Sequence, residues 1–258
     1  MLFNSIDFIV FFIIVVTSII AIKHKKFQHL FLLIASYFFF YYSSNYLIIL
    51  LIASTLLDFY LGKIIWKTKD IAKKKIFLSI SLAGNLGLLG FFKYADFAIL
   101  QFNFLGEQFN MADQIPFLNL ALPIGISFYT FQTISYTVDV YRGKLRPSES
   151  LKEFALFVAF FPQLVAGPIV RAADFLPQLR EKIEAGGGQL KQIIIHNSNL
   201  KLGITIIALG FFKKMFFADN IAPMVNEIFA MPIGLESFTI IWGIIGFGIQ
   251  IYGDFSGY

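Results

Sequence analysis

The segment LPIGISFYTFQTISYTVDVYRG, residues 122–143, mixes side chains suited to lipid with polar groups that lipid cannot satisfy. Pro123 and Gly125 disfavour a helix interior, whereas apolar and aromatic residues dominate the positions after them. Gln132 and the neighbouring Ser, Thr and Tyr residues do not form one helical stripe, and each needs a hydrogen-bond partner away from water. Two interpretations stay open from these residues: hydrogen bonds between helices, or the wall of a hydrated tunnel.

The composition assigns the chain to the integral membrane proteins. Its 258 residues are 57% hydrophobic and 18% aromatic, only 14% are charged, and the mean hydropathy is +0.73. A water-soluble domain of this size carries far more polar surface. Because one span needs about 20 apolar residues, the sequence predicts an all-α polytopic transmembrane helix bundle. We expect seven to nine spans in a single transmembrane domain over residues 1–258.

Charge and residue usage exclude several kinds of site. The chain has no cysteine, which removes disulfides, thiolate metal sites and a cysteine nucleophile. No metal-ligand cluster or phosphate-binding glycine loop is visible, so we expect no metal and no bound cofactor. The net charge of +5 comes from lysines between apolar spans. This pattern favours loop anchoring at a membrane over nucleic-acid binding.

Apolar runs and basic loops predict the topology of the first half. A turn at 43–45 divides a long uncharged run, and basic residues cluster at 23–26 and 63–75. Spans are predicted near 5–22, 28–42, 46–62 and 76–92. Since the positive-inside rule puts both basic clusters in the cytoplasm, the N-terminus is expected outside. The segment 94–120, which has acidic residues and no Lys or Arg, is expected outside as well.

The second half contains a run that a straight helix does not fit. After a fifth span near 120–140, the uncharged run 154–170 includes Pro162, Gly167 and Pro168. We predict a broken or re-entrant segment there, because non-helical backbone at membrane depth is tolerated only against protein or a water-filled cavity. Residues 171–198 are expected at the cytoplasmic surface, and further spans near 200–217 and 236–253.

Two features of this half leave alternatives. Lys213 and Lys214 would fall at the outer face, so either they snorkel or the span count is shifted there. The segments LGFFKYAD (89–96) and LGFFKKMFFAD (209–219) resemble each other. An inverted repeat could leave such a trace, but two span ends with snorkelling lysines explain it more simply.

Four polar residues are the candidate site residues, chosen by motif position and polarity: Gln132, Gln163, Arg171 and Asp254. We expect them to line a substrate tunnel. Arg171 could hold a phosphate or carboxylate, with a lipid headgroup as the simpler partner. Asp254 is either a functional ionisable group in the membrane or an interfacial one. Asp58 is expected at an interface.

The histidines His24, His29 and His196 are expected at interfaces. None of them stands in a predicted span among polar partners. We therefore do not assign any of them a catalytic role.

Five motifs in one order resemble the membrane-bound O-acyltransferase family across nearly the whole chain. They are LGFFKYADF (89–97), LPIGISFYTFQTISYTVDVYRG (122–143), FPQLVAGPIVR (161–171), LGFFKKMFFADN (209–220) and YGDFSGY (252–258). The chain looks most like the alginate O-acetylation branch. The branch that moves D-alanine onto teichoic acid is a weaker match at 122–143.

The resemblance implies an acyltransferase of the bacterial inner membrane, built as a bundle around a tunnel. The donor would be a cytoplasmic acyl thioester such as acetyl-CoA, and the acceptor an exported polysaccharide such as alginate. A periplasmic acetyltransferase would be a partner, besides membrane lipid. Residues 122–132 would line the tunnel, and 161–171 would be the broken segment beside it.

One departure from the family concerns its catalytic histidine, which stands in a Trp-His motif a few tens of residues after DFSGY. It would act as the general base, since imidazole titrates near neutral pH. The sequence ends at Tyr258, so we expect this histidine downstream, with no catalytic residue in the chain. The 258 residues would then be the N-terminal part of a longer enzyme and inactive alone. A polytopic transporter or flippase and a non-catalytic scaffold are the alternatives.

Overall fold

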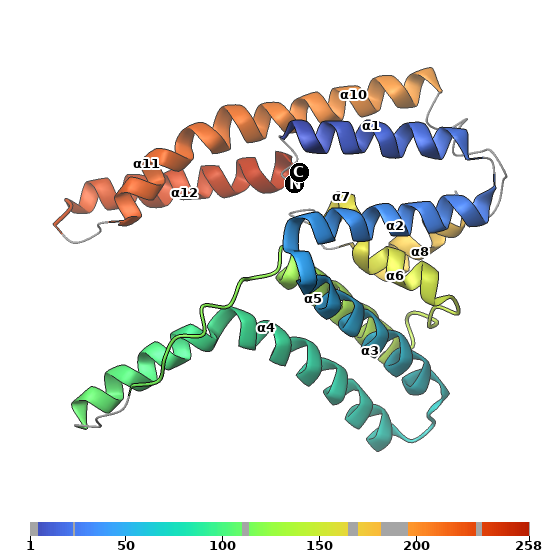
Figure 1. Cartoon of the computed structure of the whole chain (residues 1–258), viewed down its shortest axis with the longest axis horizontal. Helices are drawn as coiled ribbons and strands as arrows, with labels where there is room; N and C mark the ends of the chain where they lie inside the picture. The colour runs from blue at the N-terminus through green and yellow to red at the C-terminus, as the bar shows by residue number, and fades with distance from the viewer. Residues whose placement is uncertain are drawn as a thin grey trace. The chain divides into compact units, whose positions relative to one another are not determined.

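The structure is a computed structural model that describes residues 5–22, 24–109, 114–164, 170–181, 196–230 and 234–257. Every regular element in this part of the chain is helical (Figure 1), so the predicted all-α class is confirmed. The chain divides into two compact units. The central unit comprises residues 26–165 and 169–184, and the terminal unit comprises 1–25, 166–168 and 185–258. A single domain over 1–258 stays a prediction.

The central unit is built around α3 and α5. Its helices are α2 (Lys25–Ser44), η1 (Asn45–Leu47), α3 (Ile48–Lys67), α4 (Ile71–Gln108), α5 (Ile126–Tyr141), α6 (Leu151–Ala159), α7 (Phe161–Leu164) and α8 (Ala172–Leu179). Helix α3 packs against α4, α5 and α6, and α5 also packs against α4, α6 and α8. The predicted turn at 43–45 lies where α2 meets η1, and Asn45 has a positive φ of 50°. This break in the apolar run therefore comes from local backbone geometry.

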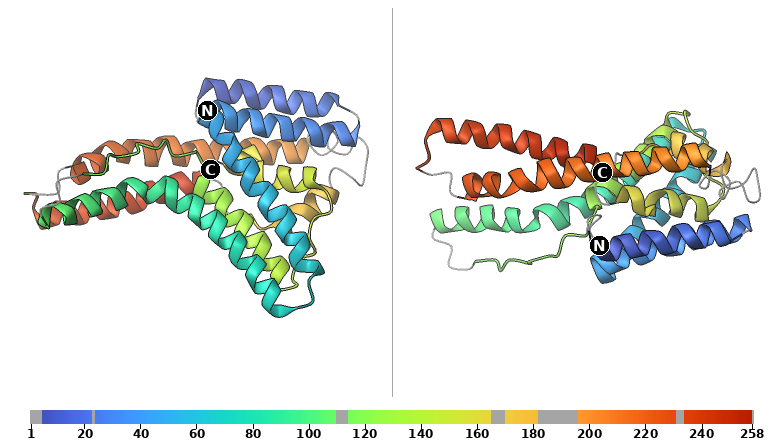
Figure 2. Two further views of the ribbon diagram at one scale, coloured as in Figure 1. Left: turned by 60° about the horizontal axis from the view of Figure 1, so that its bottom comes forward. Right: turned by 90° about the horizontal axis from the view of Figure 1, so that it is seen from above.

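Helix α4 is much longer than the predicted span 76–92. The basic stretch 63–75 is mostly helical, because α3 continues to Lys67 and α4 begins at Ile71. Asp70 caps α4 by accepting a hydrogen bond from Ala72 N at 2.8 Å. No proline occurs between residues 71 and 115, so nothing ends the helix before Gln108, and its 38 residues extend about 57 Å at about 1.5 Å per residue. Both views of Figure 2 show this helix and the segment that returns beside it.

The predicted outer loop 94–120 is helical up to Gln108, and its described residues 114–120 form extended chain. The extended part lies along the C-terminal half of α4 and is held there by side chains of that helix. Asp96 accepts hydrogen bonds from Leu118 N (2.7 Å) and Asn119 N (3.1 Å). Asn103 bonds both the N–H and the carbonyl of Ile115. The polar residues of this segment thus satisfy backbone groups that have no ladder partner.

The terminal unit contains α1 (Ile6–Ala21), α10 (Asn197–Phe211), the π-helical η3 (Phe212–Ala218), α11 (Asp219–Ala230) and α12 (Ser237–Gly257). The predicted span 200–217 is too short, since the helix continues through η3 and α11 to Ala230. Helix α12 packs against η3, α11 and α10. Four of its five glycines, Gly243, Gly246, Gly253 and Gly257, face these neighbours, and small residues let membrane helices approach closely.

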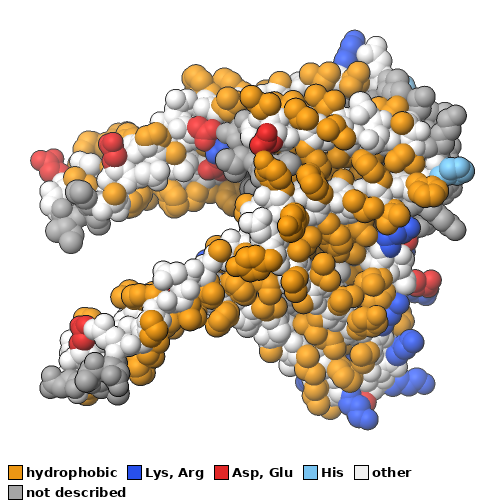
Figure 3. Space-filling view, viewed as in Figure 1, with side chains coloured by type: hydrophobic (Ala, Val, Ile, Leu, Met, Phe, Trp, Pro, Cys, Tyr) orange, Lys and Arg blue, Asp and Glu red, His pale blue; other side chains and the backbone are white. Residues whose placement is uncertain are grey.

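The hydropathy of these helices confirms an integral membrane protein. Three helical stretches are long and apolar enough to cross a membrane: Phe27–Lys67, Ile71–Gln108 and Ser237–Gly257. Helix α1 is apolar but shorter. Large hydrophobic side chains are exposed along α4, α10 and α12, and Figure 3 shows such side chains over much of one face. The same view shows Lys and Arg side chains gathered where α3 passes to α4.

Candidate functional site

The predicted break in the run 154–170 is confirmed, and it lies at Phe160 between α6 and α7. Phe160 has φ −57° and ψ 110°, which is not helical. The N–H of Phe161 would continue the helix by bonding the carbonyl of Phe157, but it donates to Ser36 Oγ on α2 at 3.3 Å. The Phe157 carbonyl therefore loses its helical partner. Gly167 and Pro168, also predicted as breakers, lie outside the described residues.

Two predicted site residues bond this freed carbonyl oxygen. Gln132 on α5 donates its Nε2 to Phe157 O at 2.8 Å, and Gln163 on α7 donates its Nε2 to the same atom at 2.7 Å. Both glutamines are buried, with 4% and 8% of their surfaces exposed. A carbonyl without a partner at membrane depth would cost several kcal/mol. The structure thus brings Gln132 and Gln163 together at the helix break.

The start of α5 packs directly against α7. Gly125 precedes the helix with φ 72°, in the left-handed region that favours glycine. A Cβ atom there would lie 2.1 Å from Leu164 O, so the approach also requires glycine. The N–H of Ile124 donates to Ser44 Oγ at 3.0 Å, and the N–H of Ile126 donates to Pro123 O at 3.2 Å. Pro123 and Gly125, which disfavour a helix interior, therefore stand just before α5 begins.

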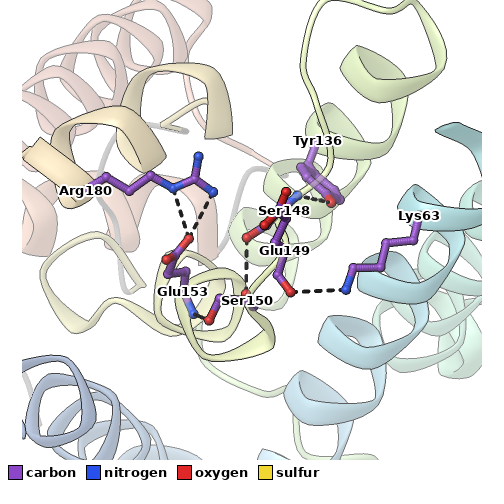
Figure 4. Close-up of polar contacts among 7 residues, drawn as sticks. All are labelled: Lys63, Tyr136, Ser148, Glu149, Ser150, Glu153 and Arg180. Atoms are coloured by element: carbon purple, nitrogen blue, oxygen red, sulfur yellow. Dashed lines mark hydrogen bonds and ion pairs between the residues drawn. The ribbon is translucent and has the colours of Figure 1, made fainter. Parts of the chain in front are cut away.

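The polar residues of α5 form two rows rather than one stripe. Gln132 bonds α6 as described, and Tyr136 lies with its ring centroid 4.4 Å from that of Phe154 on α6. The Tyr136 hydroxyl accepts a hydrogen bond from Ser148 N at 3.2 Å (Figure 4). Thr133 instead reaches Asn85 Oδ1 on α4 at 3.5 Å. These contacts join α5 to neighbouring elements, as the first of the two interpretations of this segment predicts. A tunnel stays a prediction.

Asp58 is deeply buried, so the interfacial prediction for it is wrong. Its side chain is 0% exposed. Ser81 Oγ donates to Asp58 Oδ1 at 2.5 Å, and Asn85 Nδ2 donates to Asp58 Oδ2 at 2.7 Å. Sequence reasoning missed this cluster, although Ser54, Asp58 and Gly62 recur at every fourth position of α3 and indicate a buried polar face.

A second polar cluster joins α6 to α8. Arg180 donates from Nε and Nη2 to Glu153 Oε2 at 3.1 and 3.0 Å (Figure 4). Ser150 caps α6 by accepting from Glu153 N at 3.4 Å. Lys63 Nζ bonds the Glu149 carbonyl at 3.1 Å, which ties this end of α3 to the segment before α6. These contacts hold the broken segment against α3 and α8.

The histidines divide into one buried and two exposed residues. His29 is 4% exposed, and its Nε2 has no hydrogen-bond partner among the described residues, so the interfacial prediction is wrong for it. His24 and His196 are exposed, and His196 Nδ1 lies 2.6 Å from Ser198 Oγ. No histidine contacts the helix break through a hydrogen bond in the described part of the chain.

Arg171 and Asp254 are not brought to the glutamines by any described contact. Arg171 is exposed and precedes α8, where its carbonyl accepts from Asp174 N and Phe175 N at 3.0 Å each. Asp254 belongs to the terminal unit and pairs with Lys214 Nζ at 2.6 Å. Lys214 also pairs with Asp219 at 2.7 Å.

Neither the similar segments nor the two lysines stand at the end of a helix. Residues 89–96 lie inside α4, and 209–219 lie inside the continuous helix from α10 to α11. Lys214 is held by its two carboxylates, and Lys213 Nζ lies 5.8 Å from the centroid of the Tyr252 ring. Both segments therefore lie inside helices that are longer than the predicted spans, and their position at span ends stays a prediction. Whether they form a repeat stays a prediction.

The chemistry of the helix break is binding and orientation. Among the residues that the structure describes, no three His, Asp or Glu side chains could hold a metal ion. The break offers side-chain amides and a backbone carbonyl inside an apolar surround. Such groups can hold polar backbone or a polar substrate at depth. They do not include an activated nucleophile or a histidine base.

No protein-family model matches the chain, but curated proteins do. It is 32% identical over 229 residues to the peptidoglycan O-acetyltransferase of Helicobacter pylori, covering 80% of this chain and 41% of that protein. It is 37% identical over 185 residues to the "Probable alginate O-acetylase AlgI" of Pseudomonas aeruginosa, covering 70% and 32%. The teichoic acid D-alanyltransferase of Bacillus subtilis is 26% identical over 144 residues, covering 54% and 33%.

The chain thus spans at most 41% of the length of these relatives. Their names share the transfer of an acyl group onto a polymer of the cell envelope. The alignments to the first two cover 80% and 70% of this chain. The chain belongs to the membrane-bound O-acyltransferase family.

Proposed function

We propose that the protein transfers acetyl groups from a cytoplasmic thioester donor, such as acetyl-CoA, to hydroxyl groups of an exported cell-envelope polysaccharide. The observation that carries this proposal is the 229-residue match to the peptidoglycan O-acetyltransferase. The alginate O-acetylase match agrees with it in both the acyl group and the kind of acceptor. The relative that moves D-alanine is less similar, which favours acetyl over aminoacyl transfer.

The acceptor is a glycan such as alginate or peptidoglycan. Both relatives are named for the acetylation of a polysaccharide, and both polymers lie outside the plasma membrane. A hydroxyl acceptor outside and a thioester donor inside require that the acyl group cross the membrane. A periplasmic acetyltransferase partner would take part on the outer side.

The helix break supplies the structural support for such a path. Gln132 and Gln163 hold the Phe157 carbonyl where the helix is interrupted, and non-helical backbone at depth is typical of sites that admit polar molecules. We propose that the two glutamines, with Arg171 and Asp254, line the path of the substrate. Arg171, which is exposed beside α8, is suited to a phosphate of the donor.

The basic turn between α3 and α4 supports an orientation in the bacterial inner membrane. Lysines on either side of residues 68–70 would face the cytoplasm by the positive-inside rule. The N-terminus and the extended segment 114–120 would then lie outside. In this orientation the donor approaches from the side of Arg171 and α8.

Residues 1–258 by themselves are proposed to be inactive. The resemblance attributes the general base to a histidine in a Trp-His motif, and His24, His29 and His196 do not stand in one. Acyl transfer above background by purified 1–258 would contradict this part of the proposal.

The test uses the complete reading frame that contains this sequence, expressed in cells that lack other O-acetyltransferases. Inverted membrane vesicles receive acetyl-CoA labelled in the acetyl group, and ester-linked label is measured on glycan inside the vesicles. We expect label that mild base removes. Movement of a solute without esterified label would instead identify a transporter. Vesicles without the protein are the control.

A further inference from the structure

Asp58 is a carboxyl group that no part of the proposed acyl path uses. It lies near the middle of α3, within a stretch apolar enough to cross a membrane, and is 0% exposed. Ser81 Oγ lies 2.5 Å from Oδ1, and Asn85 Nδ2 lies 2.7 Å from Oδ2. Both partners belong to α4. A buried ionisable group in a membrane helix is a functional candidate by default.

A second set of hydrogen bonds encloses the first. Asn85 Oδ1 accepts from Ser54 Oγ at 2.6 Å and from Thr133 Oγ1 at 3.5 Å. The hydroxyls of Thr133 and Thr137 on α5 also face the Asp58 carboxyl. The cluster therefore joins three helices through neutral hydroxyl and amide groups. Hydroxyl groups can either donate or accept, so the cluster can rearrange its protons without moving its heavy atoms.

In the described part of the chain, no positive charge balances this carboxyl group. Among the described residues, no Lys, Arg or His pairs with Asp58, and its partners on α4 do not titrate. Tyr136 on α5 is the titratable group that faces it, and the Tyr136 hydroxyl already bonds Ser148 N. An isolated carboxylate in a low-dielectric interior is strongly disfavoured. Either a metal cation or a proton would neutralise the group.

The spacing of the oxygens favours the proton. Around a cation with oxygen ligands at about 2.3–2.6 Å, neighbouring ligand atoms lie roughly 3.3 Å apart. Here Ser81 Oγ and Asp58 Oδ1 are 2.5 Å apart, and Ser54 Oγ and Asn85 Oδ1 are 2.6 Å apart. Both contacts are shorter than the separation of two oxygen ligands of one cation, and both fall within the range of about 2.5–3.0 Å for O–H···O hydrogen bonds.

We propose that Asp58 and Ser81 form a membrane-buried proton-binding site, which releases and takes up its proton during acyl transfer. The role of this proton in acyl transfer rests on the proposed function. In that reaction the acyl carbon–sulfur bond breaks and an acyl carbon–oxygen bond forms. The acceptor hydroxyl loses a proton, and the leaving thiolate takes one up on the opposite side of the membrane. A proton site near the middle of α3 lies between the two places.

Infrared spectroscopy of the complete protein in lipid tests the site itself. At neutral pH we expect an absorption band from a protonated carboxylic acid, and Asp58→Asn should abolish that band. Glu149→Gln is the matched control, because Glu149 is exposed and its side chain is outside the cluster; it should keep the band. Ser81→Ala should keep the band but shift it to higher frequency, since the acid loses a hydrogen-bond partner. A spectrum without the band, or a band that Asp58→Asn leaves unchanged, overturns the proposal.

Acetyl transfer in the vesicle assay tests the role of the proton. Asp58→Asn should slow transfer at least tenfold while the unfolding midpoint stays within a few degrees, and Glu149→Gln should transfer at the normal rate. If the acid band depends on Asp58 but Asp58→Asn transfers normally, the role in transfer is overturned and the site stands. If the unaltered protein does not transfer at all, the proposed function fails, and the infrared result still decides whether the site exists.

Discussion

At the scale of single residues, Gln132 and Gln163 act on one atom, the carbonyl oxygen of Phe157. Each donates a side-chain amide, at 2.8 and 2.7 Å. The two donors are redundant in one respect, because either alone still gives the carbonyl a partner. Their joint loss leaves a buried acceptor unsatisfied, which is costlier than the loss of one bond.

This redundancy predicts that the two substitutions are not additive. Methionine is similar to glutamine in shape but has no amide. We expect Gln132→Met and Gln163→Met each to lower the free energy of unfolding by about 0.5–1.5 kcal/mol. The double variant should lose about 0.5–3 kcal/mol more than the sum.

Denaturant unfolding in detergent micelles measures these free energies. Gln101→Met, at an exposed position of α4, is the control and should change little. Strict additivity of the two core substitutions would show that the glutamines do not share the carbonyl.

Gly62 is a second residue whose size decides local packing. A Cβ atom at this position would lie 2.9 Å from Tyr136 Cε1 and 3.0 Å from its hydroxyl oxygen. Tyr136 is 0% exposed, so its ring has no space to move into. We expect Gly62→Ala to destabilise the central unit by about 1–3 kcal/mol, as overpacking does.

The control for this substitution is Gly87→Ala on α4, where a Cβ atom would have no neighbour within 4 Å. Alanine there should be neutral or stabilising by up to about 1 kcal/mol, because glycine is the weaker helix former. Equal unfolding midpoints for the two variants would contradict the packing argument.

At the scale of elements, α12 meets the helices before it through glycine. A Cβ atom at Gly253 would lie 3.1 Å from Ala218 Cβ, and one at Gly243 would lie 2.7 Å from Ile228 Cγ2. Lys214, in the π-helical turn η3, pairs with Asp254 of α12 at 2.6 Å. Irregular turns of this kind commonly accompany functional positions. The close approach at Gly253 and the ion pair therefore both join η3 to α12.

Gly210→Ala should separate α10 from α12. A Cβ atom there would lie 2.4 Å from the carbonyl oxygen of Gly257, and a backbone atom cannot turn aside as a side chain can. We expect a loss of about 1–3 kcal/mol in the terminal unit. Fluorescence of Trp242, in a Trp66→Phe background, reports the unfolding of α12.

Gly203→Ala, on the same helix α10 and without neighbours within 4 Å, is the matched control. It should unfold at or above the original midpoint. If both alanine variants unfold alike, the close contact of α10 with α12 is not what stabilises the unit.

At the scale of the whole molecule, the distribution of charge governs insertion into the membrane. Lysines concentrate around the α3–α4 turn, whereas the other end of α4 carries Asp96 and Glu107. Helix α4 is far longer than the hydrocarbon layer of about 30 Å. Its two ends are therefore expected on opposite sides.

Single cysteines test this arrangement cleanly, because the chain has none of its own. We expect Lys69→Cys, in the turn before α4, to react with a membrane-impermeant maleimide only in inverted vesicles. Gln114→Cys, beyond the other end of α4, should react only in right-side-out vesicles. Labelling of both positions from one side would show that α4 does not span the membrane.

The sequence by itself determined the membrane class, the helical fold and the main interruptions. Hydropathy is a property of composition, so the apolar stretches can be read without knowing what they pack against. The turn at 43–45, the start of α5 after Gly125 and the break near Pro162 are set by the local backbone chemistry of Asn, Gly and Pro. Helix α4 ran past its predicted end where no proline stops it, whereas the α10–α11 stretch continues to Ala230 in spite of Pro223.

Only the tertiary structure decided which polar groups meet. Gln132 bonds a carbonyl 25 residues away, and Asp58 bonds side chains 23 and 27 residues away. Polarity at a position does not reveal a partner on another helix. The sequence therefore predicted Asp58 at an interface and the two glutamines as separate tunnel residues. Burial depends on which faces of the helices turn inward, and that is set by packing among segments distant in the chain.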